Sequence, residues 1–261
     1  MIGGRGWSPI VELRQYTLHA GRRDVLIDLF DSEFIESQED VGMKVIGQFR
    51  DLDDPDKFVW LRGFHDMPSR ARGLAEFYGG PVWHAHREAA NATMIDSDDV
   101  LLLRPARAGS AFMLDHDRPR RAVPGGRGFV GATIVSLEAP AEETGIVSFF
   151  EQAIMPAVIE SGGSILAYFV SEASENTFPS LPVRQGEQVL VWFAGYADGE
   201  RLRHASTGDS AALRAASEAP GLRQAPQVLR LEPTTRSLLH VRSPACGSAA
   251  LDPQSSNGKE T

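Results

Sequence analysis

Hydrophobic residues in the first half of the chain follow two different periods. Residues 11–18 mix β-branched and aromatic side chains with polar ones and predict a strand. Over 24–39 the apolar residues recur at the spacing of an amphipathic helix, and Gly42 is placed to end that helix. Further strands are predicted over 43–52, 57–64 and 100–104, with a helical region over 68–91 that is broken near Gly79-Gly80-Pro81. The order is β-α-β-β-α-β, which is the ferredoxin-like unit.

The second half of the chain repeats this order. Residues 11–50 align with 131–170 at a constant shift of 120 and without a gap, so that Phe30 falls on Phe150. After the hairpin, Trp60 falls on Trp192 at a shift of 132. The second set of predicted elements comprises strands over 129–137, 164–173, 188–196 and 227–232, a helix over 142–161 and a further helical region. This self-similarity predicts an α+β fold made of two tandem ferredoxin-like repeats.

The duplication implies a division of the chain. We predict a first repeat over 1–106, a linker over 107–126, a second and degenerate repeat over 127–240, and a disordered tail over 241–261. The hairpin loop of the second repeat, residues 174–187, is longer than its counterpart by 132 − 120 = 12 residues. A loop of that length inside a compact domain is more often functional or mobile than a simple connection between strands.

The side chains of the first hairpin separate onto two faces. Pairing Leu52 with Phe58 across the turn gathers the apolar or small residues on one face, as expected where helices pack: Val45, Gly47, Phe49, Val59, Leu61 and Gly63. The other face is polar and aromatic, and it holds Ile46, Gln48, Arg50, Trp60, Arg62 and Phe64, together with Arg14 and Tyr16 of the first strand. In the second repeat Gln48, Arg62 and Arg14 become Tyr168, Ala194 and Ile134, so the polar groups concentrate in the first half.

Two interpretations of the polar and aromatic face remain open. In the first, it packs against the matching face of the other repeat, and its charged groups, including Glu12, are paired across the two sheets. In the second, it lines a ligand cavity that contains a few convergent polar groups.

Composition narrows the classes of function. The chain has 261 residues and a net charge of −9, which argues against a nucleic-acid partner because phosphate binding needs a basic surface. No apolar stretch approaches the ~20 residues needed to cross a bilayer, and the amino terminus has no signal-peptide core. The single cysteine, Cys246, excludes an internal disulfide framework. We therefore expect a cytoplasmic protein without a membrane or nucleic-acid partner.

Four segments resemble the NIPSNAP family: ELRQYTL at 12–18, GMKVIGQF at 42–49, FVWLRGF at 58–64 and FYGGPVWHAHR at 77–87, the last being similar to its bacterial branch. The resemblance is close over 10–106, and over 127–235 it rests mainly on the internal repeat. It implies a dimeric α+β-barrel architecture in which two antiparallel ferredoxin-like sheets face one another, here supplied by one chain. That superfamily includes cofactor-free oxygenases of aromatic polyketides, haem-binding and haem-degrading proteins, and small isomerases.

The candidate site combines the polar face with the helix that carries Trp83. We predict catalytic roles for His86, Arg62 and Tyr16, and substrate contacts from Arg14, Gln48, Trp60, Trp83, Arg87 and Asn91. Arginine would hold an anionic or enolate oxygen, and the two tryptophans would stack on an aromatic ligand. The competing interpretation is a helix that packs Trp83 inward while His84 and His86 face water.

Three functions follow from these residues. The first is a small-molecule-binding protein, a candidate monooxygenase or isomerase that acts without a cofactor on an aromatic or enolisable substrate. The alternatives are a non-catalytic binding or scaffold protein, and a haem-binding protein in which His86 is the axial ligand. We expect no metal site, because His84 and His86 are two apart and point to different sides of a helix. Whether the chain is an enzyme stays open, and a homodimer or higher homo-oligomer is compatible with the fold.

Overall fold

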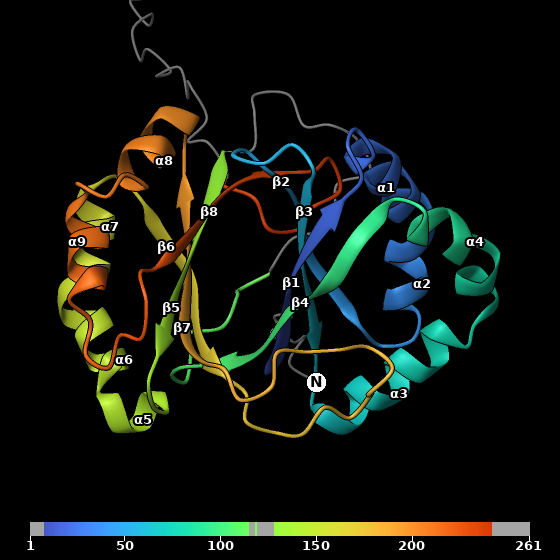
Figure 1. The fold of residues 1–261 in the computed structure, drawn as a ribbon, viewed down its shortest axis with the longest axis horizontal. Coiled ribbons are helices and arrows are strands. Elements are labelled where there is room, and N and C mark those ends of the chain that lie inside the picture. The colour runs from blue at the N-terminus through green and yellow to red at the C-terminus, as the bar shows by residue number, and fades with distance from the viewer. Residues whose placement is uncertain (1–7, 115–117, 119–127, 242–261) are drawn as a thin grey trace, which may run out of the picture.

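Eight strands close into one barrel, and each repeat supplies four of them (Figure 1). The computed structural model describes residues 8–114, 118 and 128–241. Around the barrel the strands follow the order β1-β3-β2-β8-β5-β7-β6-β4, and β4 pairs with β1 to close it. Neighbouring strands are antiparallel throughout, as the predicted fold class requires.

The first repeat forms one side of the barrel and its helical cover. Its elements are β1 (Ile10–Leu18), α1 (Arg23–Leu29), the π-helical segment η1 (Phe30–Phe34), α2 (Ile35–Glu39), β2 (Lys44–Asp51), β3 (Lys57–Phe64), α3 (Met67–Tyr78), α4 (Pro81–Asn91) and β4 (Met94–Pro105). The predicted break between the two later helices is confirmed, with Gly79 and Gly80 between them and Pro81 opening α4. Strand β4 begins earlier than predicted because its extension pairs with the end of β1, Met94 lying opposite Leu18.

The second repeat has the same order of elements. It comprises β5 (Phe129–Leu137), α5 (Ala141–Thr144), α6 (Ile146–Phe149), η2 (Phe150–Ile154), α7 (Met155–Glu160), β6 (Ser164–Ser171), β7 (Gln188–Tyr196), α8 (Gly199–Ala205), α9 (Ala211–Ser217) and β8 (Gln227–Pro233). The π-helical segments η1 and η2 lie 120 residues apart, since Phe30 corresponds to Phe150. Duplication has therefore preserved a local irregularity of the helix as well as the topology.

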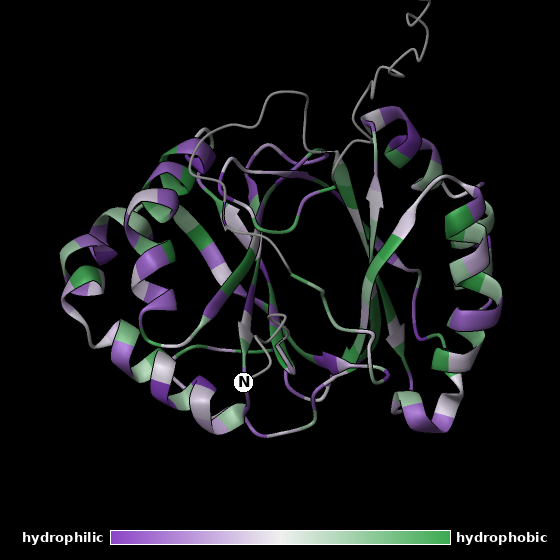
Figure 2. Cartoon of the chain, turned by 180° about the vertical axis from the view of Figure 1, so that it is seen from behind, coloured by the Kyte–Doolittle hydropathy of each residue, from purple (hydrophilic) through white to green (hydrophobic). Residues whose placement is uncertain are grey.

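The barrel interior is apolar, and its side chains fill the space between the two sheets. Its buried residues include Leu13, Phe49 and Leu61 from the first repeat and Phe169 and Phe193 from the second. Figure 2 shows many green segments along the strands, between paler and purple ones, and helices that alternate between green and purple. The hydrophobic core therefore has three parts, one inside the barrel where sheet meets sheet and one under each set of helices.

The two faces of the first hairpin are exchanged relative to the prediction. The apolar face, represented by Phe49, Val59 and Leu61, points into the barrel, whereas Tyr16 and Trp60 of the polar and aromatic face lie under the helices. The physical reason is the closed barrel: its interior has no access to water and no room for helices, so it takes the face without charges. The interpretation that the polar face packs against the other repeat is therefore wrong.

The register of the hairpin also differs from the predicted one. Arg50 lies opposite Phe58 and Gln48 opposite Trp60, two residues from the expected pairing. The turn is wider because the Asp51 carboxylate accepts hydrogen bonds from the backbone N–H groups of Asp53 and Asp54, at 2.7 and 3.1 Å. A bulge between Val45 and Gly47 then turns Val45 toward the helices and Ile46 into the barrel.

Residues from outside the strands complete the barrel core. Phe112 and Leu114, in the segment predicted as a linker, are buried there with Leu238 and Leu239. Phe112 lies against the rings of Phe169 and Phe193, with centroids 5.1 and 5.0 Å away. Most of the predicted tail, residues 242–261, lies outside the described residues, as do linker residues 115–117 and 119–126 and the first residue of the second repeat.

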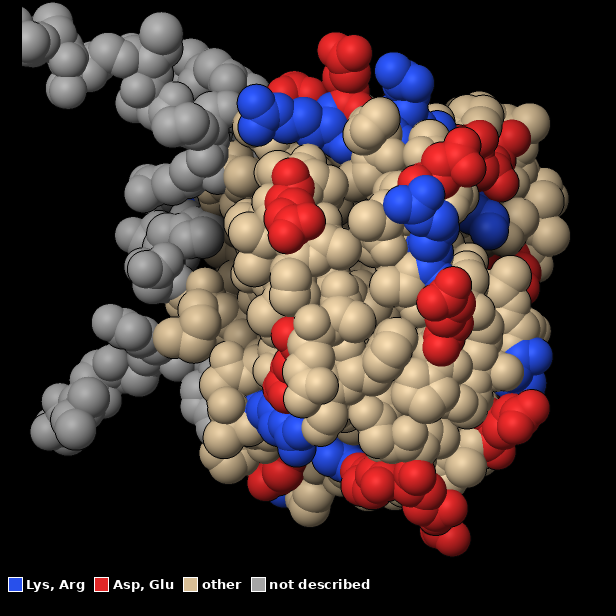
Figure 3. Space-filling view, turned by 90° about the vertical axis from the view of Figure 1, so that its left-hand side faces the viewer, with Lys and Arg blue, Asp and Glu red and all other residues tan. Residues whose placement is uncertain are grey.

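The outer face of the second repeat has a mixed charge. Figure 3 shows acidic and basic side chains interspersed around a broad uncharged area on this side of the molecule. No helix in the described part of the chain is long and apolar enough to cross a membrane.

Candidate functional site

A cluster of one glutamate and three arginines lies between the first sheet and helix α3. Glu12 and Arg14 come from β1, Arg62 from β3 and Arg70 from α3, and all four side chains are fully buried. One carboxylate oxygen, Oε2 of Glu12, accepts from Arg14 at 2.8 Å and from Arg62 at 2.6 and 3.1 Å. The other, Oε1, accepts from Nε of Arg70 at 2.7 Å. The strands bring Glu12 and Arg62 together because these residues are direct cross-strand partners.

The buried cluster carries an excess of positive charge. Three guanidinium groups face one carboxylate, which gives a formal charge of 3 − 1 = +2. Burial alone would raise the pKa of Glu12, but the attraction of Arg62, Arg14 and Arg70 outweighs it and holds that pKa well below its usual range. Desolvation lowers the pKa of Arg70, and its buried Nη2 has no hydrogen-bond partner among the described residues. The cluster therefore projects a positive potential into its surroundings.

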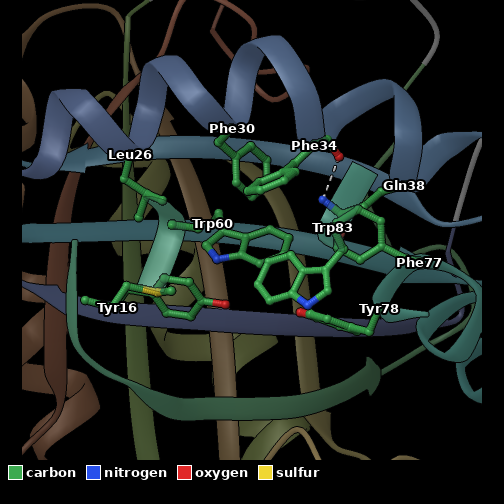
Figure 4. Close-up of a pocket in the computed structure, with 11 residues that line it drawn as sticks. Tyr16, Leu26, Phe30, Phe34, Gln38, Trp60, Phe77, Tyr78 and Trp83 are labelled. Atoms are coloured by element: carbon green, nitrogen blue, oxygen red, sulfur yellow. Dashed lines mark hydrogen bonds between the residues drawn. The ribbon is translucent and has the colours of Figure 1, made fainter. Parts of the chain in front are cut away.

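An aromatic pocket lies beside the cluster, between the sheet and helices α1 to α4 (Figure 4). Its cavity is small, with a volume of about 40 Å³, and it opens to solvent on one side. The residues that line it are Tyr16, Leu26, Phe30, Phe34, Gln38, Trp60, Phe77, Tyr78, Trp83, Ala90 and Met94. Their rings meet edge to face, for example Phe30 with Trp60 at 4.8 Å and Tyr78 with Trp83 at 4.8 Å between centroids. Such walls favour a flat, aromatic ligand.

Two hydrogen bonds connect the pocket wall to the charged cluster. Nε of Arg14 donates to the Tyr16 hydroxyl at 3.0 Å, and Nη1 of Arg62 donates to the Gln38 side-chain oxygen at 3.0 Å. Burial raises the pKa of Tyr16, and although the Arg14 charge opposes this shift, the net direction is upward. Tyr16 is therefore a neutral phenol at pH 7 whose proton is free to point at a ligand, because its oxygen accepts from Arg14.

A further hydrogen-bond donor lies in the same wall. The indole Nε1 of Trp60 is buried and has no partner among the described residues. The guanidinium groups of Arg62 and Arg14 lie over the same indole, 5.0 and 5.5 Å from the ring centroid. A buried donor without an acceptor costs about 1–3 kcal/mol. A ligand oxygen near Trp60 would remove that cost.

The structure brings together five of the nine predicted site residues. Tyr16, Trp60 and Trp83 line the pocket, and Arg14 and Arg62 lie behind its wall. Gln48 shares the helix-facing side of the sheet but lies elsewhere, where its amide donates to Asp31 at 3.3 Å. The remaining three, His86, Arg87 and Asn91, are on helix α4 but do not line the pocket, and Arg87 and Asn91 are exposed.

His86 lies on the outer side of the pocket wall. Its ring is about one third exposed, its Nε2 is 3.5 Å from Glu33, and its edge meets the ring of Phe34. An axial haem ligand must point into a cavity large enough for the macrocycle, and His86 does not point into this one. The residues present therefore do not fit the alternative in which His86 is an axial haem ligand.

Several site residues escaped the sequence analysis. Arg70, Gln38 and Phe77 were not singled out, and Glu12 was considered only as a charge-pairing partner. The aromatic spacing of Phe30 and Phe34 was assigned to the helix core, although both rings line the pocket. Among the described residues, no group of three or more His, Cys, Asp or Glu side chains is placed to hold a metal ion.

The second repeat lacks the charged cluster. Val11 lies opposite Gly63 in β1–β3, and Val130 lies opposite Gly195 in β5–β7. Gly63 and Gly195 are equivalent positions, 132 residues apart, so their partners Val11 and Val130 are also equivalent. The first strands of the two repeats are therefore shifted by 130 − 11 = 119 residues. The predicted gapless shift of 120 is wrong by one residue in this strand. The counterparts of Glu12, Arg14, Arg62 and Arg70 are therefore Gly131, Thr133, Ala194 and Leu202.

Apolar packing replaces the ion pairs in the second repeat. A Cβ added to Gly131 would lie 3.1 Å from Leu202 and 3.2 Å from Tyr196, so the space of the Glu12 carboxylate is filled. Tyr168 and Trp192 surround Phe150 there, with ring centroids 4.9 and 5.3 Å away. Among the described residues, the buried charged cluster and the aromatic pocket beside it both lie in the first repeat.

This arrangement is a closed eight-stranded α+β barrel, and one chain supplies both halves. The NIPSNAP family model matches residues 11–108, which run from β1 through the end of β4. A search of curated protein sequences finds no match to the chain.

Three solved structures share the fold over most of the chain. A candidate monooxygenase from Fusobacterium nucleatum is 9% identical with a TM-score of 0.52, and the match covers 87% of this chain and 92% of that one. A candidate monooxygenase from Lactobacillus acidophilus is 14% identical with a TM-score of 0.51, covering 90% and 97%. An anthrone oxidase-like protein is 10% identical with a TM-score of 0.52, covering 86% and 91%. At these identities the similarity shows a common fold.

Proposed function

We propose that the first repeat binds a flat aromatic molecule that carries an anionic or enolisable oxygen. The observation that carries this proposal is the aromatic pocket backed by a buried cluster of charge +2. The rings supply contact area, and the positive potential favours a ligand that brings negative charge. The hydroxyl of Tyr16 and Nε1 of Trp60 are the donors that such an oxygen would meet.

The same geometry supports chemistry through an enolate. Donors that face a developing oxyanion in a pocket of low dielectric lower the barrier to its formation. The eleven lining residues include no carboxylate and no imidazole, so the proton from carbon passes to water at the open side of the pocket. The substrate must therefore be acidic by itself. With oxygen as co-substrate, the enolate carbon forms a C–O bond and, after protonation, gives a hydroperoxide: RH + O₂ → ROOH.

Binding is tested with 2-naphthoate and its neutral counterpart 2-naphthamide, followed by quenching of tryptophan fluorescence. We expect 2-naphthoate to bind at least tenfold more tightly, which corresponds to ~1.4 kcal/mol. Trp60→Phe should weaken binding, whereas Trp192→Phe, the equivalent change in the second repeat, should leave it unchanged. Equal affinity for the two probes, or equal effects of the two variants, would contradict the proposal.

Catalysis is tested separately with 2-tetralone, a bicyclic aromatic ketone that enolises. We expect the protein to accelerate exchange of its α-hydrogens with deuterium, measured by NMR, and Tyr16→Phe to slow that exchange. Oxygen consumption under the same conditions would distinguish an oxygenase from an isomerase. Binding without exchange or oxygen uptake would instead support the non-catalytic binding protein.

A further inference from the structure

The long loop of the second repeat crosses onto the first repeat. Residues 174–187 leave the β6–β7 hairpin and run beside helix α3, as Figure 1 shows for the yellow-orange segment near that helix. Phe178 and Leu181 pack against the aromatic cluster under the first-repeat helices. Near the end of the loop, the backbone N–H of Arg184 donates to the Val100 carbonyl at 2.8 Å. The loop is thus attached to the first repeat at more than one point.

One of these attachments reaches the charged cluster. Nη1 of Arg70 donates to the side-chain oxygens of Asn176 at 2.9 Å and Thr177 at 3.1 Å. Asn176 also braces the loop internally, because its amide donates to the Leu181 carbonyl at 2.9 Å. Arg70 therefore joins Glu12 on one side to the loop on the other.

A second attachment reaches the pocket wall. The ring of Phe178 stacks on that of Tyr78, with centroids 5.8 Å apart and planes 20° from parallel. Tyr78 lines the pocket, and on its other sides it meets Phe77 and Trp83. Tyr78 is thus held between the pocket and Phe178, so that an outward rotation of its ring needs Phe178 to move.

We infer that residues 174–187 form a specificity loop, in which Phe178 holds Tyr78 in the pocket wall and so limits the size of the ligand. The inference rests on the proposed function and assigns the second repeat a role in the site of the first. It favours ligands of one or two fused rings over larger ones. Asn176 and Thr177 are positioning residues, since they keep the loop in place through Arg70.

The test compares 2-naphthoate with anthracene-2-carboxylate, which has a third fused ring. In the wild-type protein we expect the two-ring probe to bind more tightly. Phe178→Ala should improve the affinity for the three-ring probe relative to the two-ring probe by about tenfold, the scale of discrimination that pocket shape provides. The Asn176→Ala/Thr177→Ala double variant should change the ratio in the same direction. Glu175→Ala, an exposed change in the same loop, is the matched control and should leave the ratio unchanged.

The possible results separate the two proposals. If 2-naphthoate does not bind the wild-type protein, the proposed function fails. If it binds, but Phe178→Ala leaves the ratio of affinities unchanged while circular dichroism shows an intact fold, the specificity loop is overturned. Should Phe178→Ala fail to fold, Phe178→Leu and the double variant decide the question by the same ratio. A loss of both affinities by an equal factor would also overturn it, because that result indicates a general structural role.

Discussion

Arg70 and Glu12 are joined by a hydrogen bond of 2.7 Å, whereas in the second repeat the side chain of Leu202, the counterpart of Arg70, fills the space where a Cβ of Gly131 would lie. The two repeats have the same backbone order and differ in what they bury beneath the helices. The first keeps a charged cluster that an apolar filling could replace, as the second shows. Buried ion pairs of this kind contribute little net stability compared with apolar residues. The position of this cluster beside the pocket supports the ligand binding that we propose.

Replacement of Glu12 by glutamine should destabilise the protein strongly. The change leaves three buried guanidinium groups without a counter-charge, and we expect a loss of about 3–5 kcal/mol in the free energy of unfolding. Urea denaturation at pH 7 measures it. Glu142→Gln removes the exposed carboxylate that pairs with Arg104 and should cost less than about 1 kcal/mol. Similar losses for both variants would show that the Glu12 cluster does not behave as a buried charge centre.

Replacement of Asp31 by asparagine should stabilise the protein at neutral pH. Burial raises the pKa of Asp31 from 3.8 to about 6, and the attraction of Arg236 and Arg118 only partly opposes the shift. The folded state therefore binds a proton more tightly than the unfolded state, and the wild-type protein loses stability as the pH rises from about 4 to above 6.

The stability gained by Asp31→Asn should follow this pH dependence. It should be near zero below pH 4 and reach about 2 kcal/mol above pH 6, after allowance for the partial exposure of the side chain. Urea denaturation between pH 4 and pH 8 provides the profile. Ser32→Ala, an exposed change at the next position that removes no charge, is the control and should change stability equally at every pH. A gain for Asp31→Asn that does not vary with pH would rule out a raised pKa as its cause.

Two changes on helix α4 should separate the pocket from the outer surface. Trp83→Ala removes a pocket-lining ring and should weaken 2-naphthoate binding about tenfold or more. His86→Ala, three residues later, should leave the affinity within about a factor of two, since an exposed rim residue contributes little. Fluorescence titration measures both. A large loss of affinity for 2-naphthoate in His86→Ala would show that His86 contributes to the binding site.

The segment predicted as a linker should contribute to the core of the barrel. Phe112→Ala removes a buried ring between Phe169 and Phe193 and should cost about 3–5 kcal/mol. Met113→Ala, at a position about half exposed, should change stability by less than about 0.5 kcal/mol. Thermal and urea denaturation compare the two. If Phe112→Ala is as mild as Met113→Ala, this segment is only a connection.

Much of the architecture could be predicted because it depends on local patterns. The periodicity of hydrophobic residues and the positions of Gly and Pro predicted the strands and helices, and Gly79-Gly80-Pro81 marked the division between α3 and α4. The concentration of polar groups in the first repeat was also evident, and Tyr16, Trp60 and Trp83 were selected from it. The strands and helices were confirmed because residue type and short-range spacing are sufficient to predict them. The roles of Tyr16, Trp60 and Trp83 in a site stay predictions.

The sequence by itself determined the duplicated unit, the order of its elements and the half that carries the polar groups. Only the tertiary structure decided which face of each sheet points inward, because barrel closure joins β2 to β8 and β4 to β6 over distances that no local pattern encodes. It also decided that Arg70 meets Glu12, and that Phe178 of the second repeat meets Tyr78 of the first. Such contacts bring together residues far apart in the chain. They are selected by burial and by the pairing of charges, and not by spacing.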